Sequence, residues 1–112
     1  MKEKQLQQAV LNYLTLQGNL GKCLFLRNNT FCGRITRRDG SQGYIKNNTI
    51  RGAPDIMLFL PKGNTIFLEL KSDGGRLSQE QKEFAVRAER LGFSFVVVRS
   101  LDDILPYFEN QS

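Results

Sequence analysis

Two carboxylates and a lysine, placed at the ends of two neighbouring apolar segments, are the residues of this chain best suited to chemistry. Residues 52–55 read Gly-Ala-Pro-Asp and precede one apolar segment, and residues 69–71 read Glu-Leu-Lys and close the next. Residues 61–64 between them, Pro-Lys-Gly-Asn, are a strong turn signal, so we expect a hairpin of two strands. That hairpin would bring Asp55 and Glu69 to the same end.

This set has the character of a divalent-metal site that cleaves phosphodiesters. Side chains alternate along a strand, so Glu69 and Lys71 share one face while the leucines beside them turn to the core. Carboxylates are hard oxygen donors that suit Mg²⁺ or Mn²⁺, and the Leu70 carbonyl offers a further ligand. Such an ion lowers the pKa of a bound water and neutralises charge on a phosphate, while Lys71 would orient the water or stabilise the transition state. We therefore predict a metal-dependent nuclease with Asp55, Glu69 and Lys71 as catalytic residues.

Composition narrows the chemistry and the partners. The chain has 112 residues, a net charge of +5 and a pI of about 9.5, which favours an anionic partner, nucleic acid first. It has no histidine, so Ser-His-Asp hydrolysis, Cys-His proteolysis and histidine-bearing metal nucleases are excluded. Cys23 and Cys32 are too few for a structural zinc site; we expect two reduced thiols, with a disulfide as the alternative.

No segment predicts a membrane or secretory protein. No apolar run approaches the roughly 20 residues of a membrane span, and the N-terminal Met-Lys-Glu-Lys-Gln lacks the apolar core of a signal peptide. We therefore expect an intracellular protein that has no membrane partner. The length fits one domain covering residues 1–112.

The first element that must position the site is a helix over residues 2–17, whose apolar side chains recur at helical spacing until Gly18 supplies a stop. Glu3 lies three residues before Leu6 and seven before Val10, so it sits on or beside the face that turns inward. A carboxylate turned inward is costly unless something pairs with it. Glu3 therefore needs a partner.

The remaining elements predict a mixed sheet. Residues 22–27, 55–60, 65–71 and 93–99 are expected as strands. The chain between the last two strands is long enough for a right-handed crossover, which makes them parallel. Together with the helices, this gives an α/β fold: a single domain with a mixed β-sheet flanked by helices, in the order α-β-β-β-α-β-α.

The crossover is expected to contain a second helix. Ser78 and Gln81 form a capping box, and the helix runs to about Leu91, burying Phe84 and Ala88 as well as Leu91, with a glycine at its end. A short terminal helix follows Ser100 and should be interrupted or shortened by Pro106.

Residues 28–51 form a polar insertion in which basic residues are interleaved with glycines and asparagines. Asp39-Gly40, between Ile35 and Tyr44, suggests a hairpin tip. The insertion and its flanks could follow a phosphate backbone, with recognition of shape rather than sequence, or simply solubilise the chain. The candidate nucleic-acid-binding residues are Arg27, Asn28, Arg34, Arg37, Arg38, Lys46, Arg51 and Arg76.

These motifs, taken together, resemble a known family. Gly-x-Pro-Asp (52–55), Leu-Glu-Leu-Lys (68–71), Gly-Arg-Leu-Ser-x-x-Gln (75–81), then Gly92 and a valine-rich strand ending in Ser-Leu-Asp-Asp (100–103) resemble the VRR-NUC (virus-type replication-repair nuclease) domain. That domain belongs to the PD-(D/E)XK, restriction-endonuclease-like superfamily. The resemblance covers nearly the whole chain, including an N-terminal helix with an early glutamate, here Glu3.

The resemblance implies roles and partners that the residues alone do not show. Asp55 and Glu69 would be metal ligands, Lys71 the catalytic lysine and Glu3 a further acidic residue lining the site. Gln81 would face the same cleft, with a purely local capping role as the alternative. The family implies Mg²⁺- or Mn²⁺-dependent, structure-specific cleavage of branched DNA, such as four-way (Holliday) junctions or flaps, often by a homodimer. Members of this size resemble small phage or bacterial replication and repair proteins, which places the chain in the cytoplasm of a bacterium or phage-infected cell.

Three other interpretations stay open. Pro-Asp is a common turn dipeptide and Glu-x-Lys on a strand is often a solvated ion pair worth under about 1 kcal/mol. The chain could also be a catalytically inactive nucleic-acid-binding module of the same fold, although the three intact site residues argue against it. Finally, a small protein–protein adaptor would use its sheet edge and helices and would ignore DNA.

Overall fold

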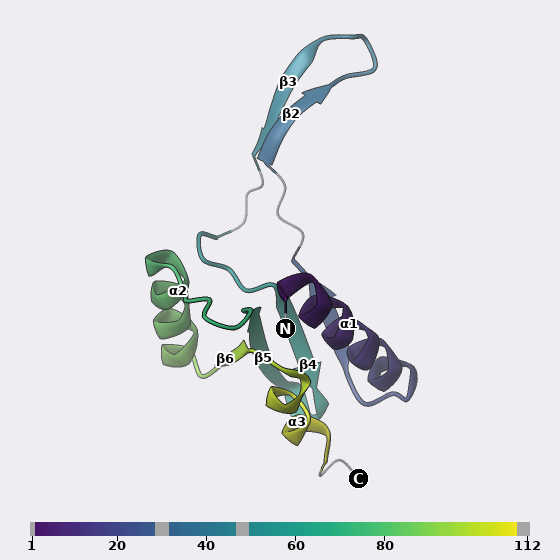
Figure 1. The fold of residues 1–112 in the computed structure, drawn as a ribbon, viewed down its shortest axis with the longest axis vertical. Helices are drawn as coiled ribbons and strands as arrows, with labels where there is room; N and C mark the ends of the chain where they lie inside the picture. Colours follow the sequence, from purple (N-terminus) through teal and green to yellow (C-terminus); the bar gives the residue numbers. More distant parts are fainter. Residues whose placement is uncertain (1, 29–31, 47–49, 110–112) are drawn as a thin grey trace.

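The computed structural model describes residues 2–28, 32–46 and 50–109, and of Cys32, Gly33, Ile45 and Lys46 it describes only the backbone. A four-stranded sheet lies between helices, and a separate two-stranded hairpin stands apart from it (Figure 1). The elements in chain order are α1 Glu3–Asn19, β1 Leu24–Arg27, β2 Cys32–Thr36, β3 Gln42–Lys46, β4 Ile56–Leu60, β5 Asn64–Leu70, α2 Gln79–Arg90, β6 Ser94–Val98 and α3 Pro106–Glu109. Short 3-10 turns occupy Pro61–Gly63 and Leu101–Asp103.

The sheet has the order β1-β4-β5-β6 and is mixed. β1 and β5 pair antiparallel with β4, and β6 pairs parallel with β5. The parallel pair is the one predicted from the long connection through α2, since parallel strands need a crossover. The predicted α/β fold, a mixed sheet flanked by helices, is therefore confirmed, and the architecture is consistent with a restriction-endonuclease-like fold.

α1 and α2 cover opposite faces of the sheet (Figure 1). Leu6, Val10 and Leu14 of α1 are fully buried and belong to one core cluster with Leu58 and Leu68 of the central strands. These residues keep the apolar spacing that predicted the helix. α3 joins the same layer, because the rings of Tyr13 and Phe108 meet edge-on with centroids 5.5 Å apart.

α1 is longer than predicted at its C-terminus. Gly18 was expected to stop the helix, but the helix continues through it to Asn19. Gly21, at φ +76°, makes the reversal instead, and the Lys22 N–H donates to the Gln17 carbonyl at 3.0 Å. This is the usual glycine-based helix ending, displaced by three residues.

α2 packs on the other face through aromatic side chains. The ring of Phe67 in β5 lies 5.4 Å from Phe84 of α2 and 5.3 Å from Phe93, and Phe84 also contacts Phe95. The helix ends at Arg90, and Leu91 is its C-cap, 74% exposed. The prediction that Leu91 is buried is therefore wrong, because the chain leaves the helix before that side chain reaches the sheet.

The polar insertion is more ordered than a loop. β2 and β3 pair antiparallel around a tip at residues 37–41, so the hairpin tip predicted at Asp39-Gly40 is confirmed. They form a sheet of their own, which adds two strands to the predicted order.

The last two features are the C-terminal helical segment and whether any helix could span a membrane. The helical segment after Ser100 is interrupted before Pro106, one of the two outcomes predicted: a 3-10 turn at Leu101–Asp103 is followed by a separate short helix that begins at Pro106. Among the described residues, no helix combines the length and the apolar character needed to cross a bilayer.

Candidate metal and phosphodiester site

Asp55 is held at the start of β4 by backbone contacts on both sides. Its Oδ2 accepts a hydrogen bond from the Leu70 N–H at 2.8 Å, and its own carbonyl accepts one from the Asn28 N–H at 2.7 Å. The Asn28 side chain donates to the Pro54 carbonyl at 3.1 Å, and Pro54 is buried. Asp55 is therefore fixed to the end of β5 through its side chain and to the end of β1 through its backbone.

Glu69 is the most unusual ionisable residue of the site, because its side chain is buried, with 3% of the residue exposed. Its Oε1 accepts a hydrogen bond from Gln81 Nε2 at 2.9 Å and lies 3.8 Å from the Lys71 ammonium. Its Oε2 is buried and has no hydrogen-bond partner. A buried carboxylate oxygen without a partner costs free energy, since desolvation is not compensated.

The electrostatics of Glu69 reflect this environment. Burial, and then the nearby negative charge of Asp55, raise its pKa to about 8, and the opposing charge of Lys71 only partly offsets them. At neutral pH the carboxyl of the metal-free protein therefore holds a proton. A cation held beside Glu69 would favour the ionised form of this carboxyl, because its positive charge would offset burial and the charge of Asp55.

Gln81 connects this carboxylate to the first turn of α2. Its side-chain carbonyl accepts from the Ser78 N–H at 2.8 Å, while its amide nitrogen donates to Glu69. The Ser78 hydroxyl in turn accepts from the Gln81 N–H at 3.1 Å, which confirms the predicted capping box. Gln81 therefore combines the two roles considered from the sequence: its amide group caps the helix and also contacts Glu69 in the cleft.

Gly52 sets the distance between the Asp55 segment and the start of α2. Its φ is +77°, and a Cβ there would lie 2.1 Å from the Glu80 carbonyl oxygen and 2.8 Å from the Gln81 nitrogen. Only glycine allows this approach of backbone to backbone. The glycine of the Gly-x-Pro-Asp motif thus serves to seat Asp55 beside the helix that carries Gln81.

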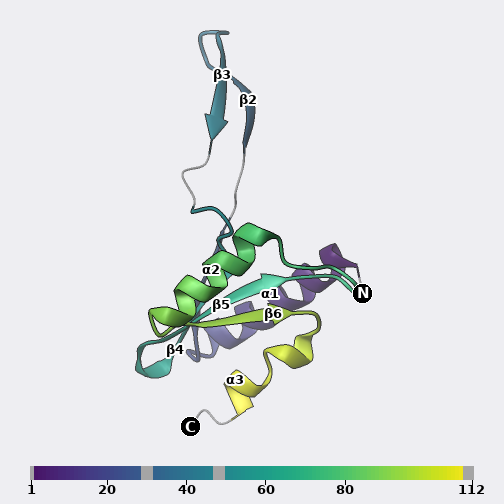
Figure 2. The ribbon, with the colours of Figure 1, turned by 90° about the vertical axis from the view of Figure 1, so that its left-hand side faces the viewer.

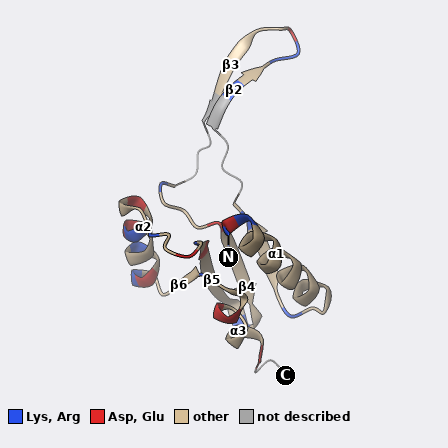
Figure 3. Ribbon diagram, viewed as in Figure 1, with Lys and Arg blue, Asp and Glu red and all other residues tan. Residues whose placement is uncertain are grey.

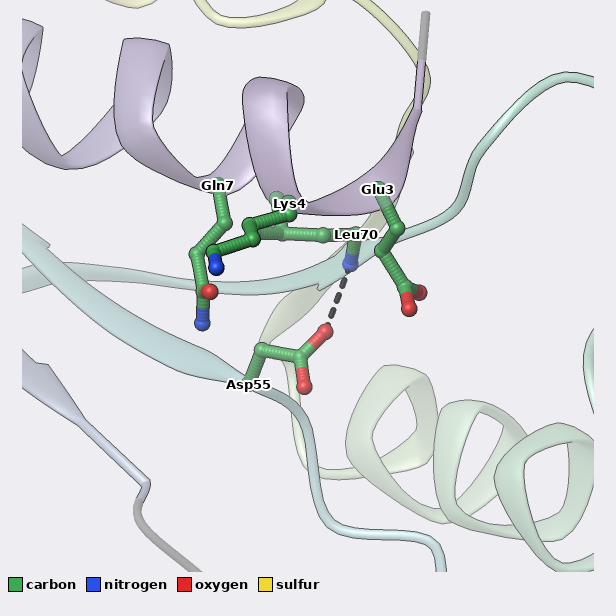
Figure 4. Close-up of a pocket in the computed structure, with 5 residues that line it drawn as sticks. All are labelled: Glu3, Lys4, Gln7, Asp55 and Leu70. Atoms are coloured by element: carbon green, nitrogen blue, oxygen red, sulfur yellow. Dashed lines mark hydrogen bonds between the residues drawn. The ribbon is translucent and has the colours of Figure 1, made fainter.

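The first turn of α1 completes a pocket over Asp55. Glu3, Lys4 and Gln7 line it together with Asp55 and Leu70, and their side chains surround the Asp55 carboxylate from above (Figure 4). Glu3 is exposed, so it is not turned inward; it lies beside the inward face of the helix, where it lines this pocket. The helix begins at Glu3, and its buried side chains begin only at Leu6.

The residues fit a hard divalent cation. Asp55 and Glu69 offer oxygen ligands, one of which has no protein partner, and Glu3 and Leu70 lie at the same pocket as Asp55. As the described side chains stand, no three of the acidic, histidine or cysteine groups are close enough to hold an ion together. Full coordination would therefore rely on two carboxylates, a backbone carbonyl and water, or on a rotation of the exposed Glu3.

The structure does not gather the predicted nucleic-acid-binding residues in one place. Arg34, Arg37 and Arg38 are exposed on the β2–β3 hairpin, which stands apart from the main sheet (Figure 3), and the side chain of Lys46 lies outside the described residues. Arg27, Arg51 and Arg76 are exposed around the main sheet: at the end of β1, in the turn before Asp55 and in the loop before α2. Asn28 is engaged with residues 54 and 55, so its contacts are structural.

Two residues beside the site were missed by the sequence reasoning, and the role of a third, Gly52, was not predicted. Lys4 lines the pocket, and the signal for it was its place next to Glu3 in the first helical turn. Arg99 donates to the Ser72 carbonyl at 3.0 Å and so ties β6 to the segment after Lys71. Gly52 was recognised only as part of a motif. Cys23, also expected as a reduced thiol, is free and buried, and the Cys32 side chain is outside the described part.

Comparison with protein families places this geometry in context. The family model described as VRR-NUC domain matches residues 2–102, nearly the whole chain. Comparison with curated proteins and with solved structures gives no match. A VRR-NUC domain implies nuclease activity on DNA. With its Asp55, Glu69 and Lys71 constellation inside the matched range, the chain belongs to the VRR-NUC domain family.

Proposed function

We propose that the protein is a divalent-metal-dependent DNA endonuclease whose active site contains Asp55, Glu69 and Lys71. The observation that carries this proposal is the buried Glu69 carboxyl, which feels the negative charge of Asp55 and lies 3.8 Å from the ammonium of Lys71. A structural ion pair would not require burial of one oxygen without a partner, whereas a cation site would. The solvated ion pair considered from the sequence does not describe a residue that is 3% exposed.

Each residue has a distinct role in the proposed reaction. Asp55 and Glu69, with the Leu70 carbonyl and Glu3 as further candidates, would hold Mg²⁺ or Mn²⁺, which supplies charge neutralisation at the phosphate and a more acidic water. Gln81 keeps the Glu69 carboxylate oriented through its hydrogen bond at 2.9 Å. Lys71, 3.8 Å from the same carboxylate, is placed to orient the attacking water or to stabilise the negative charge of the transition state.

The proposed substrate is branched DNA, a four-way junction or a flap, in phage or bacterial replication or repair. This preference follows from the family resemblance, and the separate basic hairpin supports it, because exposed arginines lie well outside the pocket. The alternative is an inactive nucleic-acid-binding module, for which no described feature offers specific support. The protein is proposed to act in the cytoplasm of the bacterium or infected cell.

We further propose a homodimer, with a second copy docked on the uncovered half of the α2-facing side of the sheet. Leu24 and Leu26 of β1 are 75% and 56% exposed, and the strand register places them beside Phe59 and Met57 on that side. A group of apolar side chains this exposed is characteristic of a protein interface. A symmetric contact between the two copies of this patch would bury it on both. Sedimentation equilibrium should show a dimer that Leu26→Lys dissociates; a monomer at all concentrations would refute it.

The decisive experiment compares cleavage by the wild-type protein and single variants. Labelled four-way-junction, flap, duplex and single-stranded DNA are incubated with Mn²⁺ or with chelator. We expect cutting of branched substrates only with the metal, and complete loss in Glu69→Ala and Lys71→Ala with folding and junction binding retained. Circular dichroism and gel shifts in chelator provide those two controls. Wild-type cleavage by either variant would sink the assignment.

A further inference from the structure

The β2–β3 hairpin is a free-standing ribbon. It pairs with no strand of the main sheet in the described chain, and it projects beyond the body of the protein in both side views (Figures 1 and 2). An isolated two-stranded hairpin is marginally stable in water, because neither face is covered. Its described side chains are almost all exposed. A partner that covers one face would stabilise such a ribbon.

One face of the ribbon is built for polar contact. The strand register pairs Arg34 with Tyr44 and Thr36 with Gln42, so these four side chains lie on the same face. The Thr36 hydroxyl and the Gln42 side-chain amide hydrogen-bond each other at 3.1 to 3.3 Å. Tyr44 is 66% exposed. Cation, hydroxyl, amide and phenol groups together match a phosphate–sugar surface better than an apolar protein face.

The tip is basic and internally fixed. Arg37 NH1 donates to the Gln42 carbonyl at 2.8 Å, and its guanidinium lies across Gly43, where a Cβ would be only 2.2 Å away. The Ser41 N–H donates to Asp39 at 2.8 Å and, with the Ser41 hydroxyl, lowers the pKa of that carboxyl. Arg38 has no such tie and is exposed. The tip therefore presents a preformed turn with cations around it.

We propose that the β2–β3 ribbon inserts into the major groove of a DNA duplex that flanks the cleavage site. The major groove is about 12 Å wide and admits a two-stranded ribbon. Strands of five residues span about 17 Å, the rise of roughly five base pairs. Arg34 and Arg38 contact phosphates along the groove walls, so the contact is independent of sequence.

This inference deepens the proposed function and rests on it only for the choice of DNA. The ribbon would bind a duplex arm outside the active site. Branched substrates with long arms provide such a duplex. Binding is measured in chelator, where no cutting occurs. Failure of catalysis and failure of the ribbon contact are therefore distinguishable.

The test uses four-way junctions whose arms are lengthened in steps of a few base pairs. The ribbon variant is Arg34→Gln with Arg38→Gln, and the matched control is Arg87→Gln with Arg90→Gln, exposed arginines in the last turn of α2 with the same change in charge. The affinity of the wild type and of the control variant for the junction should rise when each arm is lengthened by about five base pairs. The ribbon variant should lose that gain, about tenfold, and its salt dependence should fall by roughly two phosphate contacts.

Guanine methylation by dimethyl sulfate reads the groove directly, because N7 lies in the major groove. We expect wild-type protein to protect guanines of one arm outside the cut site and the ribbon variant to leave them reactive. Equal protection by both proteins, or an arm-length gain that survives in the ribbon variant, would overturn the proposal. So would a ribbon variant that is monomeric in sedimentation while the control is dimeric, since the ribbon's partner would then be a second copy of the chain.

Discussion

Binding of Mn²⁺ to this protein is expected to be coupled to the release of one proton from Glu69. Burial and the charge of Asp55 raise the pKa of that carboxyl to about 8, whereas a metal ion requires the ionised form. Below pH 8 the ion must therefore displace a proton. Above pH 8 the carboxyl is already ionised, and the coupling disappears.

The size of the effect follows from that pKa. Each pH unit below 8 weakens the apparent affinity by up to tenfold, or about 1.4 kcal/mol, so the affinity should rise about fifty-fold between pH 6 and pH 8. At pH 7 about 0.9 proton should be released for each ion bound. Above pH 8 the affinity should level off.

Isothermal titration calorimetry measures both quantities. Titrations in two buffers of different ionisation enthalpy at pH 7 give the number of protons released, and a pH series gives the slope. An affinity that is flat from pH 6 to pH 8, with no proton released, would show that Glu69 is already ionised in the free protein and would refute the reasoning. In the absence of metal, Asp55→Asn should lower the pKa of Glu69, because it removes one of the causes of the raised value.

The same pKa gives a second measurement without any metal. The folded-state pKa of Glu69 is raised above the ordinary value of 4.5, so the folded protein binds the extra proton. Its contribution to stability is complete below about pH 4.5 and is lost as the pH rises to about 8, by at most about 1.4 kcal/mol per unit. Thermal unfolding in chelator should show this decline in the wild type, and Glu69→Gln should flatten it.

Two further substitutions test how the site is held. Gln81→Ala should destabilise the protein by about 1 kcal/mol and should also weaken Mn²⁺ binding, because it removes both the cap and the hydrogen bond to Glu69. Ser78→Ala should destabilise the protein by a similar amount but leave Mn²⁺ binding intact. Equal Mn²⁺ affinities of the two variants in calorimetry would show that Gln81 acts only as a cap. Gly52→Ala should destabilise the protein by more than Gly63→Ala and should slow cleavage, because both glycines have positive φ but only Gly52 meets the α2 backbone. Equal unfolding free energies for the two alanine variants would rule out the close approach.

The sequence was most informative where a period or a turn decides the structure. Alternation along a strand placed Glu69 and Lys71 on one face, and the turn at Pro61–Gly63 brought Asp55 beside them. Their proximity could be predicted for this reason, although their roles stay predictions. The capping box at Ser78 followed from a local spacing of three residues, which needs no knowledge of tertiary structure.

What the sequence could not show depends on contacts between distant segments. The raised pKa of Glu69 depends on burial by α2 and on Asp55, and the role of Asn28 depends on a segment 26 residues away. The clash that reserves position 52 for glycine exists only after α2 has packed there. Helical periodicity gives the face of a residue but not how fully that face is covered, so it could not show that Glu3 is exposed.

The hydrogen bonds that fix the site join parts of the chain made at different times during synthesis. Asp55 is bound to Leu70, Glu69 to Gln81, and the pocket also needs the first turn of α1. A ribosome-bound chain that ends before α2 has emerged would lack the group that orients Glu69. A nascent chain therefore cannot assemble the candidate site until its second helix has emerged from the ribosome.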